Sequence, residues 1–175
     1  MKSETSQYIK FVILHLLIGL AIFLVPPISK LYAISIILVG FRYVILRKNA
    51  NNEALYVAAY IVGAEVFLRM TQGNFFEQYA KYGVIGILMV GMLFRGFSKN
   101  AVMYWIFGLL LIPSIILSFF TLDYETDIRK AITFNIVGPI CLTVCAIYCY
   151  QRKVSLLQLE YIIKAMALPL VAILT

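Results

Sequence analysis

The chain is built from long apolar runs that are separated by short polar segments. Within each run the apolar residues are continuous, whereas the strands of a membrane barrel would alternate between apolar and polar positions. A helix needs roughly 17–25 mostly apolar residues to cross a bilayer. We predict a membrane-spanning helix for each of the seven apolar runs, which cover residues 8–25, 31–46, 54–70, 79–94, 101–120, 131–150 and 157–175.

Prolines and basic residues mark the ends of several runs. Pro26 and Pro27 follow the first run, and proline cannot continue the hydrogen-bond ladder of a helix. The first run has no small-residue cleavage site behind it, so we interpret it as an uncleaved span and not as a signal peptide. Arg47 and Lys48 close the second run, and Pro113 is expected to interrupt the fifth.

The basic residues are distributed unevenly between the connecting segments. With seven spans, the N-terminus and the connections after spans two, four and six lie on one side of the membrane. An excess of Lys and Arg in short loops marks the cytoplasmic side, so we predict that the N-terminus is inside. The predicted inner side holds Lys2, Lys10, Arg47, Lys48, Arg95, Lys99, Arg152 and Lys153, and the outer side holds Lys30, Lys81, Arg129 and Lys130.

The composition agrees with a membrane protein. The chain has 175 residues, of which 63% are hydrophobic and only 13% are charged, whereas a soluble domain carries far more charge. The net charge of +7 does not indicate nucleic-acid binding, because the basic residues lie in short loops between apolar runs. We therefore predict an all-α integral membrane protein, with residues 1–175 forming a single transmembrane bundle that contacts membrane lipids.

Two charged residues lie within the third apolar run. Glu65 and Arg69 are four positions apart, so on a helix they share one face, with Glu before Arg in the favourable order. One interpretation is a self-neutralising pair near the outer helix end, from which Arg69 reaches toward water. The other is a bundle-facing pair that directs Arg69 at an anionic ligand. The guanidinium group of Arg69 is planar and permanently charged, so it would suit a diphosphate.

A second group of polar residues begins the sixth run at its outer end. Arg129 and Lys130 follow three acidic residues, at a predicted helix N-terminus where the macrodipole disfavours cations. The position of these two cations suggests an anionic partner. A solvated loop is an alternative explanation for their presence. Asn135 lies inside the span and can hydrogen-bond across helices. Gly138 and Pro139 are expected to break the helix at depth, a feature that often lines a cavity.

No motif for a metal or a cofactor is found. Cys141, Cys145 and Cys149 share one helix face, and we interpret them as packing residues rather than as a thiolate metal site. The single histidine, His15, is far from them in sequence. The sequence shows neither a nucleophile elbow nor a phosphate-cradling glycine loop, so it contains no complete active site.

Two stretches resemble a known family. Residues 129–173, which begin "RKAITFNIVGP", are similar to the middle spans of the bacterial O-antigen ligase and polymerase-like membrane glycosyltransferases, in which an Arg and an "FN-x-x-GP" stretch open a span and a basic "RK" closes it. Residues 53–71, "EALYVAAYIVGAEVFLRMT", resemble earlier spans of the same proteins. The resemblance is to a pattern that covers about two thirds of the chain.

The resemblance implies an activity in lipopolysaccharide biosynthesis at the periplasmic face of the bacterial inner membrane. Members of this family transfer a glycan from an undecaprenyl-diphosphate carrier to lipid A-core or to another glycan, without metal or nucleotide. Outer-face arginines hold the diphosphate and a large outer loop supplies the base. Arg129 matches the family pattern and Arg69 matches by placement, with Glu65, Lys130 and Asn135 in supporting roles.

This chain departs from the family in having about seven spans and no large outer loop. We therefore expect it to be the N-terminal portion of a longer protein, to be inactive alone, and to have the remaining C-terminal spans as a partner. Two other interpretations remain open. One is a polytopic transporter or carrier subunit with an intramembrane site at Glu65 and Arg69. The other is a small structural membrane protein without a ligand.

Overall fold

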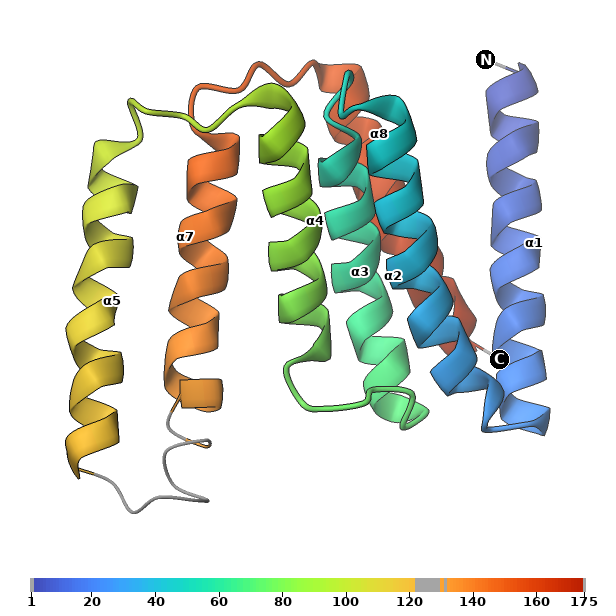
Figure 1. Cartoon of the computed structure of the whole chain (residues 1–175). Helices are drawn as coiled ribbons and strands as arrows, with labels where there is room; N and C mark the ends of the chain where they lie inside the picture. The colour runs from blue at the N-terminus through green and yellow to red at the C-terminus, as the bar shows by residue number, and fades with distance from the viewer. Residues whose placement is uncertain (1, 122–129, 131, 175) are drawn as a thin grey trace.

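The chain folds into a bundle of roughly antiparallel helices in the computed structural model (Figure 1), which describes residues 2–121, 130 and 132–174. Every regular element within these residues is helical. Seven are α-helices: α1 (Lys2–Leu24), α2 (Ile28–Arg47), α3 (Glu53–Met70), α4 (Tyr79–Arg95), α5 (Val102–Thr121), α7 (Val137–Cys149) and α8 (Leu156–Val171). A π-helical turn, η1 (Ile132–Ile136), precedes α7, and a short 3-10 turn, η2 (Ala172–Leu174), follows α8.

The all-helical prediction is confirmed for these residues, and each predicted apolar run corresponds to a helix. Three helical segments are long and apolar enough to cross a membrane by themselves, namely Ser6–Leu24, Ile28–Arg47 and Leu156–Leu174. Two further apolar segments, Val102–Leu117 and Thr133–Cys149, are shorter. These lengths indicate association with a membrane.

The two expected interruptions of the helices have different outcomes. The interruption expected at Pro113 is wrong, because α5 continues through this residue. The break expected at Gly138 and Pro139 does not occur at these residues, which lie in the first turn of α7; the irregular segment is η1, directly before α7. A proline lacks the N–H group and its ring collides with the carbonyl four residues before it, which here belongs to Asn135 in η1. The wider π-helical turn is a common way to accommodate such a disturbance.

The helix α3 lies at the centre of the larger half of the bundle. It packs against α8, α4 and α2, while α7 lies beside α4, and α5 beside α7 at one edge. Small side chains at Ala54, Ala58 and Ala64 are buried on α3 and allow its neighbours to approach. The approach is closest at Gly63, where an added Cβ would collide with the backbone carbonyl of Met166 in α8.

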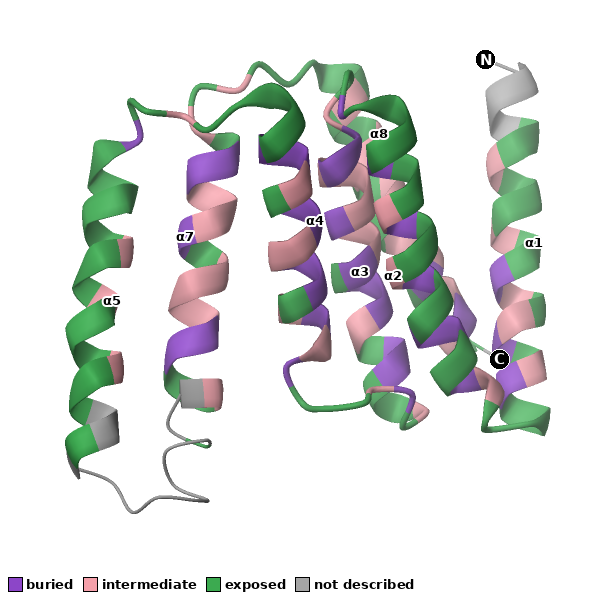
Figure 2. Ribbon diagram, viewed as in Figure 1, coloured by how far each residue is buried: buried purple, intermediate pink, exposed green. Residues whose placement is uncertain are grey.

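The outward faces of the helices are apolar and exposed, as Figure 2 shows most clearly for α5. Met103, Leu110 and Phe120 on this helix are 79%, 67% and 83% exposed. A surface of this kind is unfavourable in water over such an area, but it matches the hydrocarbon region of a bilayer. The exposed apolar surface therefore agrees with the membrane association that the helix lengths indicate.

The connections gather at the two ends of the bundle (Figure 1). The N-terminus and the α2–α3, α4–α5 and α7–α8 connections lie together at one end, which we call the amino-terminal end. The α1–α2 and α3–α4 connections lie at the other, which we call the far end. The strongly basic connecting segments identified in the sequence therefore do share one end.

Candidate functional site

At the far end, Glu65 and Arg69 form the ion pair that their spacing suggests. Nε and Nη2 of Arg69 both donate to Oε1 of Glu65, at 3.0 and 2.6 Å. Nη2 also donates to the backbone carbonyl of Glu77 at 3.0 Å. The side chain of Arg69 is 50% exposed and that of Glu65 is 23% exposed. The guanidinium group is thus held in place while part of it remains accessible.

The side chain of Glu65 is partly buried, and Lys81 on α4 lies near the beginning of α7. Lys81, on α4, places its Nζ 3.9 Å from the position that a Cβ on Gly138 would take. The charged group of Lys81 therefore lies close to the beginning of α7.

The other predicted site residues belong to the segment that leads into α7. Lys130 and Asn135 are both exposed, and Asn135 lies in η1. Arg129 lies outside the described residues, so its predicted convergence with Arg69 remains a prediction. Thr143 donates to the carbonyl of Pro139 at 2.8 Å, which provides a partner for one carbonyl near the helix irregularity.

The α3–α4 connection at the far end contains buried amide groups with unused acceptors. The side-chain oxygens of Asn74 and Gln78 are buried and accept no hydrogen bond from any described residue. The connection itself is fixed to α2, because Ser29 and Thr71 share a hydrogen bond of 2.5 Å and Tyr79 donates to the carbonyl of Ala33 at 2.9 Å. Unused buried acceptors normally take a donor from water or from a ligand.

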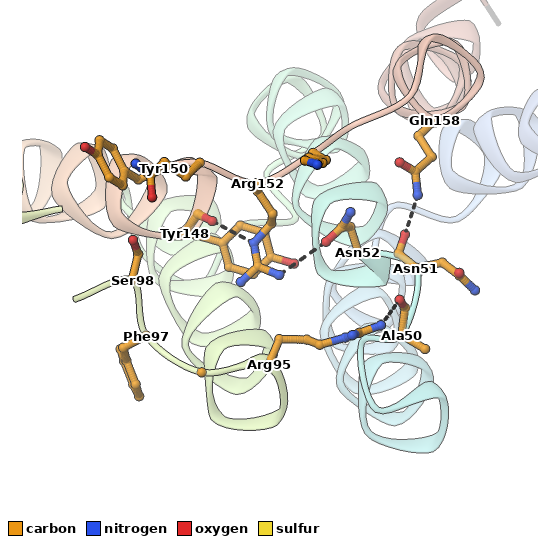
Figure 3. A pocket seen from close by; sticks show the side chains of 13 residues that line it. Ala50, Asn51, Asn52, Arg95, Phe97, Ser98, Tyr148, Tyr150, Arg152 and Gln158 are labelled. Carbon is orange, nitrogen blue, oxygen red and sulfur yellow. Dashed lines mark hydrogen bonds between the residues drawn. The ribbon is translucent and has the colours of Figure 1, made fainter. Parts of the chain in front are cut away.

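A polar cavity of about 570 Å³ opens at the amino-terminal end (Figure 3), and we call it the basic cavity. It is lined by the segments 50–52, 95–98 and 150–153, together with Tyr148 and Gln158. Three of the lining residues are cations, and none of them is acidic. The only acidic residue of the adjacent 47–53 segment, Glu53, is 2% exposed and accepts a hydrogen bond from the backbone of Asn51 at 2.9 Å.

Arg152 is held on one wall of the basic cavity. Its guanidinium carbon lies 3.9 Å from the centre of the Tyr148 ring, a cation–π arrangement. Nε donates to the carbonyl of Tyr148 at 2.7 Å, and Nη1 donates to Oδ1 of Asn52 at 3.2 Å. Figure 3 shows the side chain lying between Tyr148 and Asn52. These contacts fix the guanidinium group and engage two of its three nitrogens.

Arg95 occupies the opposite side of the same cavity, as Figure 3 shows. Nε donates to the carbonyl of Asn49 at 3.0 Å, and Nη2 donates to the carbonyl of Ala50. The helix α4 is thereby attached to the α2–α3 connection. No ion pair with a carboxylate is formed by Arg95 or Arg152 among the residues that the structure describes.

Asn49 is the buried residue on which this end of the bundle depends. Its Nδ2 donates to the carbonyl of Gly91 at 3.0 Å and to the hydroxyl of Tyr148 at 2.8 Å. Its Oδ1 accepts from the backbone N–H of Ala54 at 3.0 Å, near the start of α3. One amide group thus joins the α2–α3 connection to α3, α4 and α7.

Sequence reasoning missed this arrangement because each basic residue was interpreted as an orientation signal for the membrane. One sequence signal was available in the "KNANN" segment at 48–52, since asparagine tolerates the left-handed backbone conformation better than most residues. The structure places Lys48, Asn49 and Asn52 in that conformation, with φ angles of 51°, 50° and 61°. Non-glycine residues in this region often accompany binding sites.

The cysteines of α7 are free thiols. Across the described part of the chain, no three His, Cys, Asp or Glu side chains lie close enough together to hold a metal ion. A comparison with known proteins finds no matching family model, no matching curated protein and no matching solved structure. The family resemblance of residues 53–71 and 129–173 therefore stays a prediction.

Proposed function

We propose that this chain, with its seven predicted spans, forms part of a membrane glycosyltransferase of the O-antigen ligase or polymerase type in the bacterial inner membrane. In this assignment the amino-terminal end of the bundle is cytoplasmic and the far end is periplasmic. The clustering of basic connections at one end supports the orientation. The substrate would be a glycan linked to undecaprenyl diphosphate.

The observation that carries the proposal is the held guanidinium group of Arg69 at the far end. Glu65 and the carbonyl of Glu77 engage its Nε and Nη2, and Nη1 donates to no described residue. Because the carboxylate of Glu65 does not contact all three nitrogens of the Arg69 guanidinium group, an anion can still bind to the exposed side of that group. A positioned arginine at the outer end of a span is suited to a diphosphate.

The chemical role of Arg69 follows from where negative charge increases during transfer. When the sugar–phosphate bond of the donor breaks, the leaving diphosphate gains negative charge, and a fixed cation stabilises that charge without having to reorganise. Lys130 and Lys81 would add positive charge at the same end. The base that removes the proton from the acceptor hydroxyl is not assigned to this chain.

The test is complementation of a strain that lacks the full-length gene, with surface glycan attachment as the readout. We expect Arg69→Ala and Arg129→Ala each to abolish attachment while the protein still inserts into the membrane. The matched control is Lys164→Ala, because Lys164 forms the same kind of pair with Glu160, four residues away, on α8. Full activity of both arginine variants would refute the proposal.

One observation favours a second candidate, the transporter or carrier subunit. The Nζ of Lys81 lies beside Gly138 at the beginning of α7, directly after the π-helical turn η1, and the side chain of Glu65 on α3 is only 23% exposed. Irregular helices beside polar or charged groups are typical of transport sites. Reconstituted protein that moves protons or a solute across vesicles, and loses this activity with Glu65→Gln, would support the second candidate over the first.

A further inference from the structure

The basic cavity combines several cations with a lining that contains no carboxylate. Three cations line one polar space of about 570 Å³ with no carboxylate among the lining residues. Surface arginines commonly pair with acidic side chains, which neutralise them. Here the partners of Arg95 and Arg152 are backbone carbonyls and a neutral amide, so neither guanidinium group is paired with a carboxylate among the described residues.

The hydrogen bonds that hold these arginines leave donors for a further ligand. Nη2 of Arg152 and Nη1 of Arg95 have no partner among the described residues, while the other nitrogens of each group are engaged. Stacking on Tyr148 fixes the plane of the Arg152 guanidinium group. Each group can therefore donate to an oxyanion without a further loss of side-chain freedom, which favours binding.

The remaining wall of the cavity supplies neutral polar groups. The side chains of Ser98, Asn51 and Gln151 line it beside Lys153. Gln151 and Asn52 adopt the left-handed backbone conformation, with φ angles of 55° and 61°. Two chain segments at this wall thus keep a strained conformation, which structures often retain where a ligand binds.

From these observations we infer that the basic cavity binds a phosphate group. The cavity opens at one end of the bundle, where it could reach the phosphates of a surrounding bilayer, and the same chemistry would accept a soluble phosphate. The inference does not depend on the proposed glycan transfer, because that function involves the opposite end of the bundle. Arg95 and Arg152 would hold the phosphate between them, and Lys153 would add charge from the rim.

The experiment uses the full chain in nanodiscs of neutral phosphatidylcholine. In one arm, inorganic pyrophosphate is titrated and binding is followed by calorimetry. In the other arm, phosphatidic acid is included in the bilayer and the lipid retained after extraction is counted by native mass spectrometry. Binding in the first arm identifies a soluble phosphate as the ligand, and retention in the second arm alone identifies a lipid headgroup.

Arg152→Gln is expected to weaken binding by about tenfold to a hundredfold, the usual effect of losing a charge-assisted hydrogen bond. Arg152 also joins α7 to Asn52, so this variant could lose structure. Lys153→Gln provides a second test, because Lys153 lines the cavity and has no hydrogen bond to the described residues. We expect about threefold weaker binding for it.

Arg47→Gln is the matched control, since Arg47 is exposed at the same end and does not line the cavity. It should leave binding unchanged. Trp105, the only tryptophan of the chain, donates to the carbonyl of the lining residue Ser98 at 3.0 Å, so its fluorescence offers a local second readout. Absence of binding in both arms would overturn the inference, as would equal losses in Arg47→Gln and Arg152→Gln.

Discussion

The two ends of the bundle use polar residues in different ways. At the amino-terminal end, Asn49 bonds to Tyr148 across 99 positions of sequence, and Arg152 bonds to Asn52 across 100. At the far end, the ion pair of Glu65 and Arg69 joins two residues of one helix. The amino-terminal end therefore depends on the whole fold for its geometry, whereas the far-end pair needs only a helix.

This difference has a consequence for function. A pair formed within one helix adds little to the stability of the bundle, so Arg69 can be replaced with little structural damage and its effect on activity can be measured directly. A network that joins the α2–α3 connection to three helices is part of the fold, so substitutions there must be separated into structural and binding effects. The following predictions use stability to test this distinction.

The largest effect is expected for Asn49→Leu. The substitution has a similar volume but leaves the carbonyl of Gly91, the hydroxyl of Tyr148 and the N–H of Ala54 without their buried partner. We expect a loss of about 3 kcal/mol in the free energy of unfolding, measured by denaturant titration in detergent. Asn135→Leu, at an exposed position, should change stability by less than about 0.5 kcal/mol. Equal effects at the two positions would contradict the comparison.

Gly91→Ala is expected to cause the next largest loss of stability. An added Cβ would lie 2.7 Å from the Cβ of Ala54 and 2.9 Å from both Nδ2 of Asn49 and Cε2 of Tyr148. Overpacking of this kind costs about 2 kcal/mol. The control is Gly138→Ala, since its nearest neighbour would be 3.9 Å away, and it should be neutral or slightly stabilising. A stable Gly91→Ala protein would show that the helices α3, α4 and α7 are less tightly packed than described.

Ser155→Ala should have an intermediate effect at the amino-terminal end. Ser155 and Gln158 form a reciprocal capping box at the start of α8, with backbone-to-side-chain distances of 3.0 and 3.2 Å. Loss of an N-cap costs about 1 kcal/mol, which thermal unfolding can resolve. Ser35→Ala is the control, because Ser35 bonds to a carbonyl in the middle of α2 and caps no helix. Identical melting shifts in both variants would argue against the capping role.

The smallest effect is expected for the pair of Glu65 and Arg69. A double-mutant cycle with Glu65→Gln and Arg69→Gln should give a coupling energy of about 0.5 kcal/mol, because the pair is partly exposed and lies within one helix. The pair of Glu160 and Lys164 on α8 provides the reference cycle and should give a similar value. A far-end coupling several times larger than the reference would show that Glu65 is bound into a tertiary network.

The location of the helices followed from the sequence because apolar length and the positions of charges are local properties. The common end of the basic connections followed from the alternation of the helices. The effect of proline did not follow reliably. Pro113 lies inside a continuous helix, whereas Pro139 follows a π-helical turn. The outcome depends on whether the surrounding chain can adjust its hydrogen bonds, and this is not encoded in the proline itself.

By itself, the sequence determined the helices, their apolar character and the local pair of Glu65 and Arg69, since each depends on residues within a few positions of one another. Tertiary structure alone decided that Arg95 and Arg152 share a cavity and that Asn49 joins the α2–α3 connection to α4 and α7. Those contacts connect residues that lie between 42 and 100 positions apart in the sequence, and their partners are carbonyls and amides that every chain contains in abundance. Only the packing of the helices selects which of these groups meet.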